Sequence, residues 1–365
     1  MPGAKLKYGL IGTGQRGCKH IEVLRQVPEV EIVAVSDPHR PSVDRALAML
    51  PEPASVRTYS SYLDLLADPG LDAVLISSPN HTHVDVIADA VRYDKHIYVE
   101  KPLAHTPEGA ARIVELVRDF EKIFWVGLQY RYMPPVAYLR DRIEGGDCGA
   151  VKMLTIREHR GPFRDKVGNW NRFSRWSGGT LVEKCCHYFD LLNLLAGSRP
   201  LQVYASGAAD VNHQDERYEG ERPDIIDNAY VIVDYEAGIR ALLDLCMFHP
   251  AANTHAHMFV SATGDGGYAH AKMPSSEVVV ERFAMRQAER VEFQDPPEVA
   301  TNHSGSDLRA HQAFAQCLIE KGNPEVDVDS AALSVYVGAA AERSIEWGRV
   351  VTIAEVQAGS LSPDA

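Results

Sequence analysis

The sequence predicts an α/β protein: an N-terminal doubly wound parallel sheet, followed by an α+β domain with a large, mostly antiparallel open sheet. Three observations indicate this. Apolar runs alternate with helical patterns over the first third of the chain, and glycines spaced G-x-G-x-x-G follow the first run. From Val151 onward, longer strand-like runs joined by glycine-containing turns replace that rhythm. At 365 residues the chain is long enough for two domains, which we place at 1–132 and 133–356, with a tail at 357–365.

The first apolar run, Tyr8 to Ile11, has the length of one buried strand. The glycines after it have no Cβ, so the chain can turn sharply, admit a pyrophosphate and enter a closely packed helix. The N-terminus of that helix offers free N–H groups and a positive dipole end to phosphates. Taken alone, this spacing also fits an ordinary glycine-rich turn. The residues expected around the phosphates are Gly12, Thr13, Gly14, Gln15, Arg16 and Gly17, with Arg16 as a charged donor.

The second apolar run, Val30 to Val35, ends just before Asp37, which lies twenty residues after Gly17. A carboxylate at this point can accept hydrogen bonds from both ribose hydroxyls of adenosine. The pattern therefore predicts a dinucleotide site. Asp37 favours NAD, because a 2′-phosphate would meet its charge, whereas Arg40 acts in the opposite direction and leaves NADP as an alternative.

Three further strands are expected at Ala73–Ile76, His96–Val99 and Ile123–Val126, and a short edge strand at Arg57–Tyr59. In doubly wound sheets ligands bind beyond the carboxyl ends of the strands. The polar residues that follow these strands, and that we expect near the ligand, are Ser78, Pro79, Asn80, His83, Glu100, Lys101, Gln129 and Arg131.

The second half of the sequence predicts one long helix, several strands and two helices near the C-terminus. The helix is expected at Thr180–Leu195, and a charged surface loop at Asn212–Asp224. The expected strands are Val151–His159, Leu201–Ala205, Ala229–Tyr235, Ile239–Phe248, Met258–Thr263 and Glu277–Phe283, and the closing helices are Asp307–Glu320 and Ser330–Trp347.

Lys101 follows a buried strand and precedes a proline. At the strand's carboxyl end it would face a nicotinamide, where partial desolvation would lower its pKa and let it bind or relay a substrate proton. The alternative is a surface lysine in a turn between a strand and a helix.

Glu183 and His187 are four residues apart, so a continuous helix would present them on one face, with Asp190 nearby. A histidine beside a carboxylate suits removal of a hydroxyl proton near neutral pH. A structural histidine with an acidic partner is one alternative. A zinc pair is another, but it lacks a third ligand, and we predict no metal. Aromatic faces and polar edges of the kind that bind sugars, or that simply pack, are supplied by Tyr130, Arg131, His159, Trp170, Arg172 and Trp176.

Composition excludes several other roles. The net charge of −13 disfavours nucleic acid and anionic membranes as partners. No apolar run approaches the ~20 residues of a membrane span, and no secretory signal precedes the first strand, so we expect a cytoplasmic protein. The six cysteines show no C-x-x-C spacing and are expected to be free thiols.

These residues together resemble the Gfo/Idh/MocA oxidoreductase family over nearly the whole chain. The resemblance rests on Gly12-Thr13-Gly14, Pro79-Asn80 with His83, Glu100-Lys101-Pro102, and Gly178-Gly179 followed by Glu183 and His187. It implies a Rossmann domain, a nicotinamide cofactor, and a C-terminal domain whose open sheet often forms an oligomer interface. The family's catalytic lysine falls on Lys101, and its aspartate and histidine fall on Glu183 and His187. Glutamate replaces the aspartate here, and Arg131 falls where the family often contacts substrate.

The resulting hypothesis is an NAD(P)-dependent dehydrogenase that moves hydride between nicotinamide and a ring hydroxyl or ketone of a sugar, sugar derivative or cyclitol, as a homodimer or homotetramer. His187 would take the hydroxyl proton, and Lys101 would hold the reacting oxygen. Glu183 would orient His187 or form a hydrogen bond with a neighbouring hydroxyl. One alternative is an NAD-dependent glycosidase that works by oxidation and elimination with tightly retained cofactor. Another is a cofactor-binding sensor without turnover. The residues expected to contact substrate are Lys101, Arg131, His159, Trp170, Arg172, Glu183 and His187.

Overall fold

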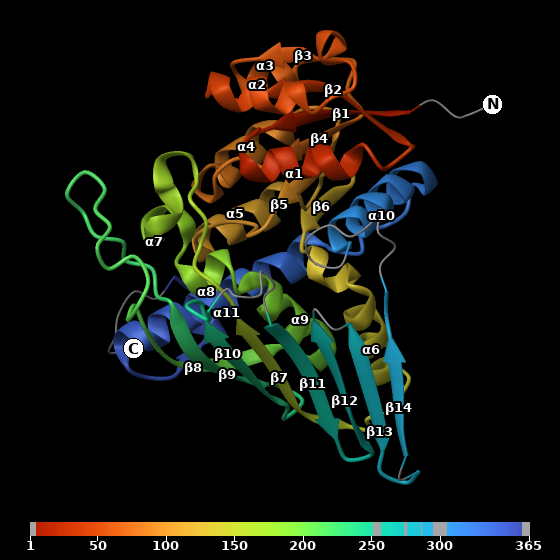
Figure 1. Cartoon of the computed structure of the whole chain (residues 1–365), viewed down its shortest axis with the longest axis vertical. Helices are drawn as coiled ribbons and strands as arrows, with labels where there is room; N and C mark the ends of the chain where they lie inside the picture. The colour runs from red at the N-terminus through yellow and green to blue at the C-terminus, as the bar shows by residue number, and fades with distance from the viewer. Residues whose placement is uncertain (1–4, 251–256, 274–275, 286, 295–304, 360–365) are drawn as a thin grey trace.

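A computed structural model describes residues 5–250, 257–273, 276–285, 287–294 and 305–359, and it contains two sheets (Figure 1). The first sheet has the order β3-β2-β1-β4-β5-β6, and all its pairs are parallel. The strand order reverses between β1 and β4, which makes that point the topological switch where doubly wound sheets bind ligands. The strands are β1 (Leu6–Ile11), β2 (Val30–Ser36), β3 (Arg57–Tyr59), β4 (Ala73–Ile76), β5 (His96–Glu100) and β6 (Phe124–Gly127).

Helices connect these strands, as the right-handed crossovers of a parallel sheet require. Local chemistry sets several of their starts: the Thr106 hydroxyl accepts a hydrogen bond from the amide of Gly109, and Pro107 occupies the first turn. The helical segments are α1 (Gln15–Leu24), α2 (Arg40–Ala48), η1 (Pro53–Ser55), α3 (Tyr62–Leu66), η2 (Asn80–Thr82), α4 (His83–Ala90), α5 (Pro107–Leu116), η3 (Gln129–Tyr132) and α6 (Pro134–Glu144).

The second sheet has the order β14-β13-β12-β11-β7-β10-β9-β8-β15. Its neighbours are antiparallel except β7 and β10, which run parallel. The strands are β7 (Val151–His159), β8 (Pro200–Ala208), β9 (Asn228–Tyr235), β10 (Arg240–Cys246), β11 (His257–Gly264), β12 (Gly267–Met273), β13 (Glu277–Arg282), β14 (Gln287–Glu292) and β15 (Val351–Thr352).

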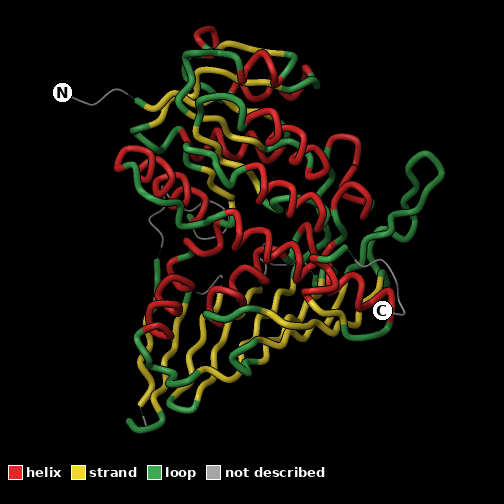
Figure 2. The backbone as a smooth tube through the Cα atoms, turned by 180° about the vertical axis from the view of Figure 1, so that it is seen from behind, coloured by secondary structure: helices red, strands yellow, loops and turns green. Residues whose placement is uncertain are grey.

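Helices lie between the two sheets and cover one face of the second (Figure 2). Because one face is covered, side chains along β8 alternate between buried and exposed: Val203 and Ala205 are buried, whereas Tyr204 between them is exposed. Helix α10 packs on α1 and η3, and its Phe314 contacts the rings of Tyr8 and Tyr98 in the first sheet. The helical segments of this half are η4 (Val167–Arg172), α7 (Ser174–Ser177), α8 (Thr180–Glu183), α9 (Cys186–Ala196), α10 (Ser306–Glu320), α11 (Val328–Trp347) and α12 (Ile353–Gln357).

The predicted fold class is confirmed, including the parallel first sheet and the mostly antiparallel second one. The single helix expected at Thr180–Leu195 is wrong, because the helix is interrupted at Lys184 and Cys185, between α8 and α9. Strands β12, β14 and β15 were not expected. Most of the expected tail, residues 360–365, lies outside the described residues. No helix in the described part of the chain is long and apolar enough to cross a membrane.

Candidate active site

Two glycines of the first turn are required by the fold. Gly12 has a φ of +91°, and a Cβ there would lie 2.7 Å from the backbone of Ser77 and Ser78. A Cβ on Gly17 would lie 2.3 Å from the carbonyl oxygen of Gly12. Gly14 differs, because a Cβ there would meet nothing within 4 Å, and Gly14 directly precedes α1. The turn therefore leaves open space at the N-terminus of α1, which fits the approach of a pyrophosphate.

Asp37 is held beside this turn. Its carboxylate accepts hydrogen bonds from the amide of Thr13 at 2.7 Å, from the Thr13 hydroxyl at 3.2 Å and from the amide of His39 at 2.8 Å. Arg40 instead pairs with Asp44 on its own helix at 2.8 Å. The residues thus fit the adenosine ribose of NAD, and Arg40 contributes no partner to Asp37.

Arg16 and Glu100, both expected at the cofactor, are paired with each other. The Arg16 guanidinium lies 2.8 Å from Glu100 and 2.7 Å from Asp307, which joins α1, β5 and α10 in one ion-pair network. Burial opposes ionisation of Glu100, but the charge of Arg16 and a hydrogen bond from His20 hold its pKa well below the usual range. A buried carboxylate needs such partners, so this network stabilises the packing of the three elements, and the expected contacts of Arg16 and Glu100 with the cofactor stay a prediction. The side-chain amide of Gln129 lies against Arg16.

Lys101 meets Glu183 across the two halves of the fold. Its ammonium donates to the main-chain oxygen of Glu183 at 2.8 Å and lies 3.6 Å from the carboxylate. Asn80 donates to the other carboxylate oxygen at 2.5 Å and to the Ser177 carbonyl at 3.1 Å. Burial alone would lower the Lys101 pKa, but the charge of Glu183 raises it above its ordinary value. The expected lowering of the pKa is therefore wrong, because the charges of Glu183, Cys186 and Glu100 together outweigh desolvation.

His187 lies beyond the break that follows Glu183, at the start of α9, and is buried. Its imidazole stacks on the ring of Tyr130, with centroids 4.0 Å apart and planes 5° apart. The two expected catalytic groups of this segment therefore sit on separate short helices. Asp190, expected near the same face, instead pairs with Arg131.

The Ser78–His83 segment is braced from within. The Ser78 hydroxyl accepts a hydrogen bond from Thr82 at 2.7 Å. The fully buried His83 has its ring nitrogens 2.9 Å from the Pro102 carbonyl oxygen and 3.1 Å from that of Ser78. His83 thereby ties the Pro79 turn to the turn that carries Lys101, and its expected place at the cofactor stays a prediction.

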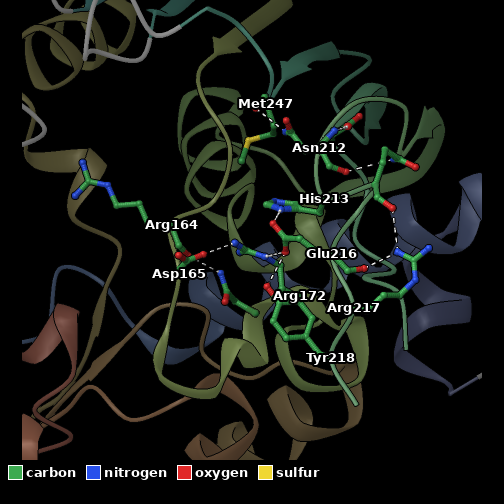
Figure 3. A network of polar contacts seen from close by, with 12 residues as sticks. Arg164, Asp165, Arg172, Asn212, His213, Glu216, Arg217, Tyr218 and Met247 are labelled. Atoms are coloured by element: carbon green, nitrogen blue, oxygen red, sulfur yellow. Dashed lines mark hydrogen bonds and ion pairs between the residues drawn. The ribbon is translucent and has the colours of Figure 1, made fainter. Parts of the chain in front are cut away.

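Two arginines expected to contact substrate have buried guanidinium groups that are held in ion pairs. Arg131 donates to Asp190 at 2.7 Å and to the carbonyl of Glu325 at 3.1 Å. Arg172 is 1% exposed, and it donates to Asp165 at 2.7 Å and to Glu216 at 2.9 Å (Figure 3).

In Figure 3 the carboxylate of Glu216 also meets His213 and Tyr218, at 2.6 and 2.7 Å. This network joins the loop after β7 to the loop before β9. Arg131 and Arg172 thus cross-link segments that are distant in the sequence, since each buried guanidinium is held by carboxylates. Their expected contact with substrate stays a prediction.

His159 and Trp170 remain partly accessible. His159 lies on β7 with Nε2 3.0 Å from the Asp244 carboxylate on β10. Trp170 joins an aromatic group on the loop that faces η2: the ring of His81 lies 6.2 Å from Trp170 and 4.9 Å from Trp176. These contacts place Trp170 beside the Asn80 turn.

Sequence reasoning missed Lys166 and Lys184. The Lys166 ammonium lies 6.0 Å from the Trp170 ring, and it is near enough to Lys101 and Glu183 for their charges to act on its pKa, which burial lowers. Lys184 is buried and donates to the Tyr130 hydroxyl at 2.7 Å. Lys166 lies in an irregular loop, so no periodic pattern indicates it. For Lys184, its position directly after Glu183 was the available signal.

Comparisons with known proteins agree with this arrangement. A family model described as "Oxidoreductase family, NAD-binding Rossmann fold" matches residues 6–128, and one described as "Oxidoreductase family, C-terminal alpha/beta domain" matches residues 140–353. The uncharacterized oxidoreductase YrbE of Bacillus subtilis is 31% identical over 65% of each chain. Myo-inositol 2-dehydrogenase of Thermotoga maritima is 24% identical over 96% of this chain and 99% of its own.

Solved structures share the whole fold. An oxidoreductase domain protein from Kribbella flavida has a TM-score of 0.85 at 18% identity, covering 96% of this chain and 100% of that chain. Levoglucosan dehydrogenase in complex with NADH has a TM-score of 0.82 at 19% identity, covering 96% and 99%. With both family models matched in order, the N-terminal sheet is an NAD-binding Rossmann domain, and the chain belongs to the Gfo/Idh/MocA oxidoreductase family.

Proposed function

We propose that this protein is an NAD-dependent dehydrogenase that acts on a ring CH–OH group of a sugar, sugar derivative or cyclitol. The observation that carries the proposal is the charged Lys101, held by Glu183 at the carboxyl end of β5 beside the switch point of an NAD-binding domain. Relatives named as inositol dehydrogenases and a structural neighbour named as levoglucosan dehydrogenase support the substrate class.

The residues fit a bound NAD at the open turn around Gly14 and at the Asp37 carboxylate. When bound, the nicotinamide would accept a hydride from the substrate carbon. Lys101, which stays protonated, would donate a hydrogen bond to the substrate oxygen and stabilise negative charge that develops on it. His187 would accept the hydroxyl proton.

Glu183 would act through Lys101 and Asn80, because its carboxylate already accepts a hydrogen bond from Asn80 and lies 3.6 Å from Lys101. This role differs from the two expected for Glu183, which were to orient His187 or to form a hydrogen bond with a neighbouring hydroxyl. Its part becomes one of positioning and charge balance.

The test is formation of NADH, followed by absorbance at 340 nm, with NAD and with NADP against inositols, monosaccharides, anhydrosugars and glycosides. We expect a steady rise with NAD and at least one cyclic polyol. The Lys101→Met and His187→Ala variants should each lose about two to four powers of ten in turnover while still binding NAD. Unchanged turnover in either variant would remove that residue from the mechanism.

The glycosidase alternative predicts aglycone release without net NADH and with retained cofactor. The relatives named above are dehydrogenases and oxidoreductases, and they give it no support. A flat trace at 340 nm with aglycone release from a glycoside would overturn the dehydrogenase proposal in its favour. NAD binding without any turnover across the panel would instead favour a sensor.

A further inference from the structure

Lys184 is a buried cation that the proposed reaction does not use. It lies at the break between α8 and α9, where the chain leaves helical register and its side chain enters the interior. Its ammonium donates to the Tyr130 hydroxyl at 2.7 Å and lies 5.1 Å from the Tyr188 ring centroid. A lysine is rarely fully buried unless a partner offsets the free-energy cost of removing its charge from water.

Tyr130 connects this lysine to the candidate base. The Tyr130 hydroxyl accepts the hydrogen bond from Lys184. The Tyr130 ring stacks on the His187 imidazole, with ring centroids 4.0 Å apart and planes 5° apart. Lys184, Tyr130 and His187 therefore form a continuous row from the helix break to the site. A parallel stack at this distance fixes the plane of the imidazole, and the hydrogen bond fixes the tyrosine in turn.

The charges around Lys184 come from several elements. The Glu158 carboxylate on β7 lies 3.8 Å from the ammonium and partly balances it, whereas Arg160 and Lys101 add positive charge. Burial, followed by the charge of Arg160, lowers the Lys184 pKa to about 7. Below that pH the ammonium is charged, so a proton added to the nearby imidazole meets a like charge in a weakly screened interior.

We propose that Lys184, acting through Tyr130, is a positioning residue that fixes the ring plane of His187 and keeps its imidazole neutral and able to accept a proton. The proton-accepting part rests on the proposed function. The effect on the imidazole itself does not, because it is a property of the substrate-free protein.

The test measures the His187 titration directly. Protein labelled with ¹³C at histidine Cε1 is titrated by NMR without cofactor or substrate, and His187→Asn identifies the resonance. Lys184→Met removes the charge at similar volume and should raise the His187 pKa by roughly one unit. Lys95→Met is the matched control: Lys95 is also buried, and it donates to the carbonyl oxygens of Asp68 and Leu71 in the first domain. Its His187 titration should match that of the wild type.

Tyr130→Phe keeps the protein testable if Lys184→Met does not fold. This variant removes one oxygen and keeps the ring, so the Lys184 ammonium loses its hydrogen bond and should become neutral more readily. Because a neutral Lys184 no longer opposes protonation of His187, the His187 pKa should again rise. An identical His187 titration in the wild type and in either variant would overturn the proposal. A shifted titration in a protein without dehydrogenase turnover would instead uphold the proposal and reject the function.

Discussion

The ammonium of Lys101 lies 2.8 Å from the main-chain oxygen of Glu183 and 3.6 Å from its carboxylate. The lysine follows the fifth strand of the Rossmann sheet, and the glutamate closes a short helix of the second domain. This pair is one of the contacts that link the two halves of the chain at the site. Because the carboxylate favours the ammonium, we expect Lys101 to act as a donor and a positive charge rather than as a base.

Substitutions at Gly12 and Gly14 should distinguish an effect on folding from an effect on cofactor binding. Gly12→Ala places a Cβ 2.7 Å from backbone atoms at a φ of +91°, so we expect a loss of about 1–3 kcal/mol in the free energy of unfolding. Gly14→Ala meets nothing within 4 Å and should change stability by less than about 1 kcal/mol.

The same Gly14→Ala variant should weaken NAD binding by roughly tenfold or more, since its methyl group occupies the space open to the pyrophosphate. Chemical denaturation and quenching of tryptophan fluorescence by NAD measure the two effects. If Gly14→Ala bound NAD like the wild type, the pyrophosphate would have to lie elsewhere.

The features that could be predicted from the sequence are those encoded by short, local patterns of residues. Strand and helix alternation, the requirement for Gly12 and Gly17, and the place of Asp37 all follow from short stretches of chain. The partners of the arginines do not, because Arg16 meets Asp307 across 291 residues and Arg131 meets Asp190 across 59. A charged side chain shows its chemistry in the sequence but not whether a distant carboxylate already occupies it. The helix break at Lys184 was missed for a similar reason: the apolar periodicity continues through it, and the buried contact with Tyr130 is tertiary.

Asp37 should decide between the two cofactors. Its carboxylate is fixed by the Thr13 and His39 amides, and Arg40 is paired with Asp44, so we expect the wild type to bind NAD at least about tenfold more tightly than NADP. Asp37→Ser should weaken NAD binding and strengthen NADP binding. Asp44→Ala releases Arg40 without touching Asp37 and should leave NAD affinity unchanged. Equal affinity of the wild type for both cofactors would contradict this reading.

The outer face of the second sheet should form the interface of a homodimer or homotetramer. The helices cover the other face, and Tyr204, Tyr230 and Ile232 on β8 and β9 are 47%, 62% and 44% exposed. Exposed apolar clusters of this kind mark association surfaces. Ile232→Glu should lower the mass measured by light scattering, because it buries an unpaired charge on association. Leu63→Glu is the control, since Leu63 is 43% exposed on α3 of the first domain, and its mass should not change. A monomeric wild type would rule the interface out.

Replacing Glu183 tests its role directly through the pH dependence of kcat/KM. Glu183→Gln removes the largest of the negative charges that raise the Lys101 pKa against burial, so that pKa should fall. The ammonium then loses its proton at lower pH, and the alkaline limb of the profile should move down by about one pH unit. Asn80→Ala cuts the hydrogen bond to the carboxylate but keeps its charge, so it should reduce the rate with a smaller shift of that limb. Glu183→Asp also keeps the charge but retracts it by one methylene, and it should keep the limb in place at a reduced rate. An alkaline limb that stays fixed in Glu183→Gln would mean that Lys101 does not need the carboxylate to stay charged, and that Glu183 contacts the substrate instead.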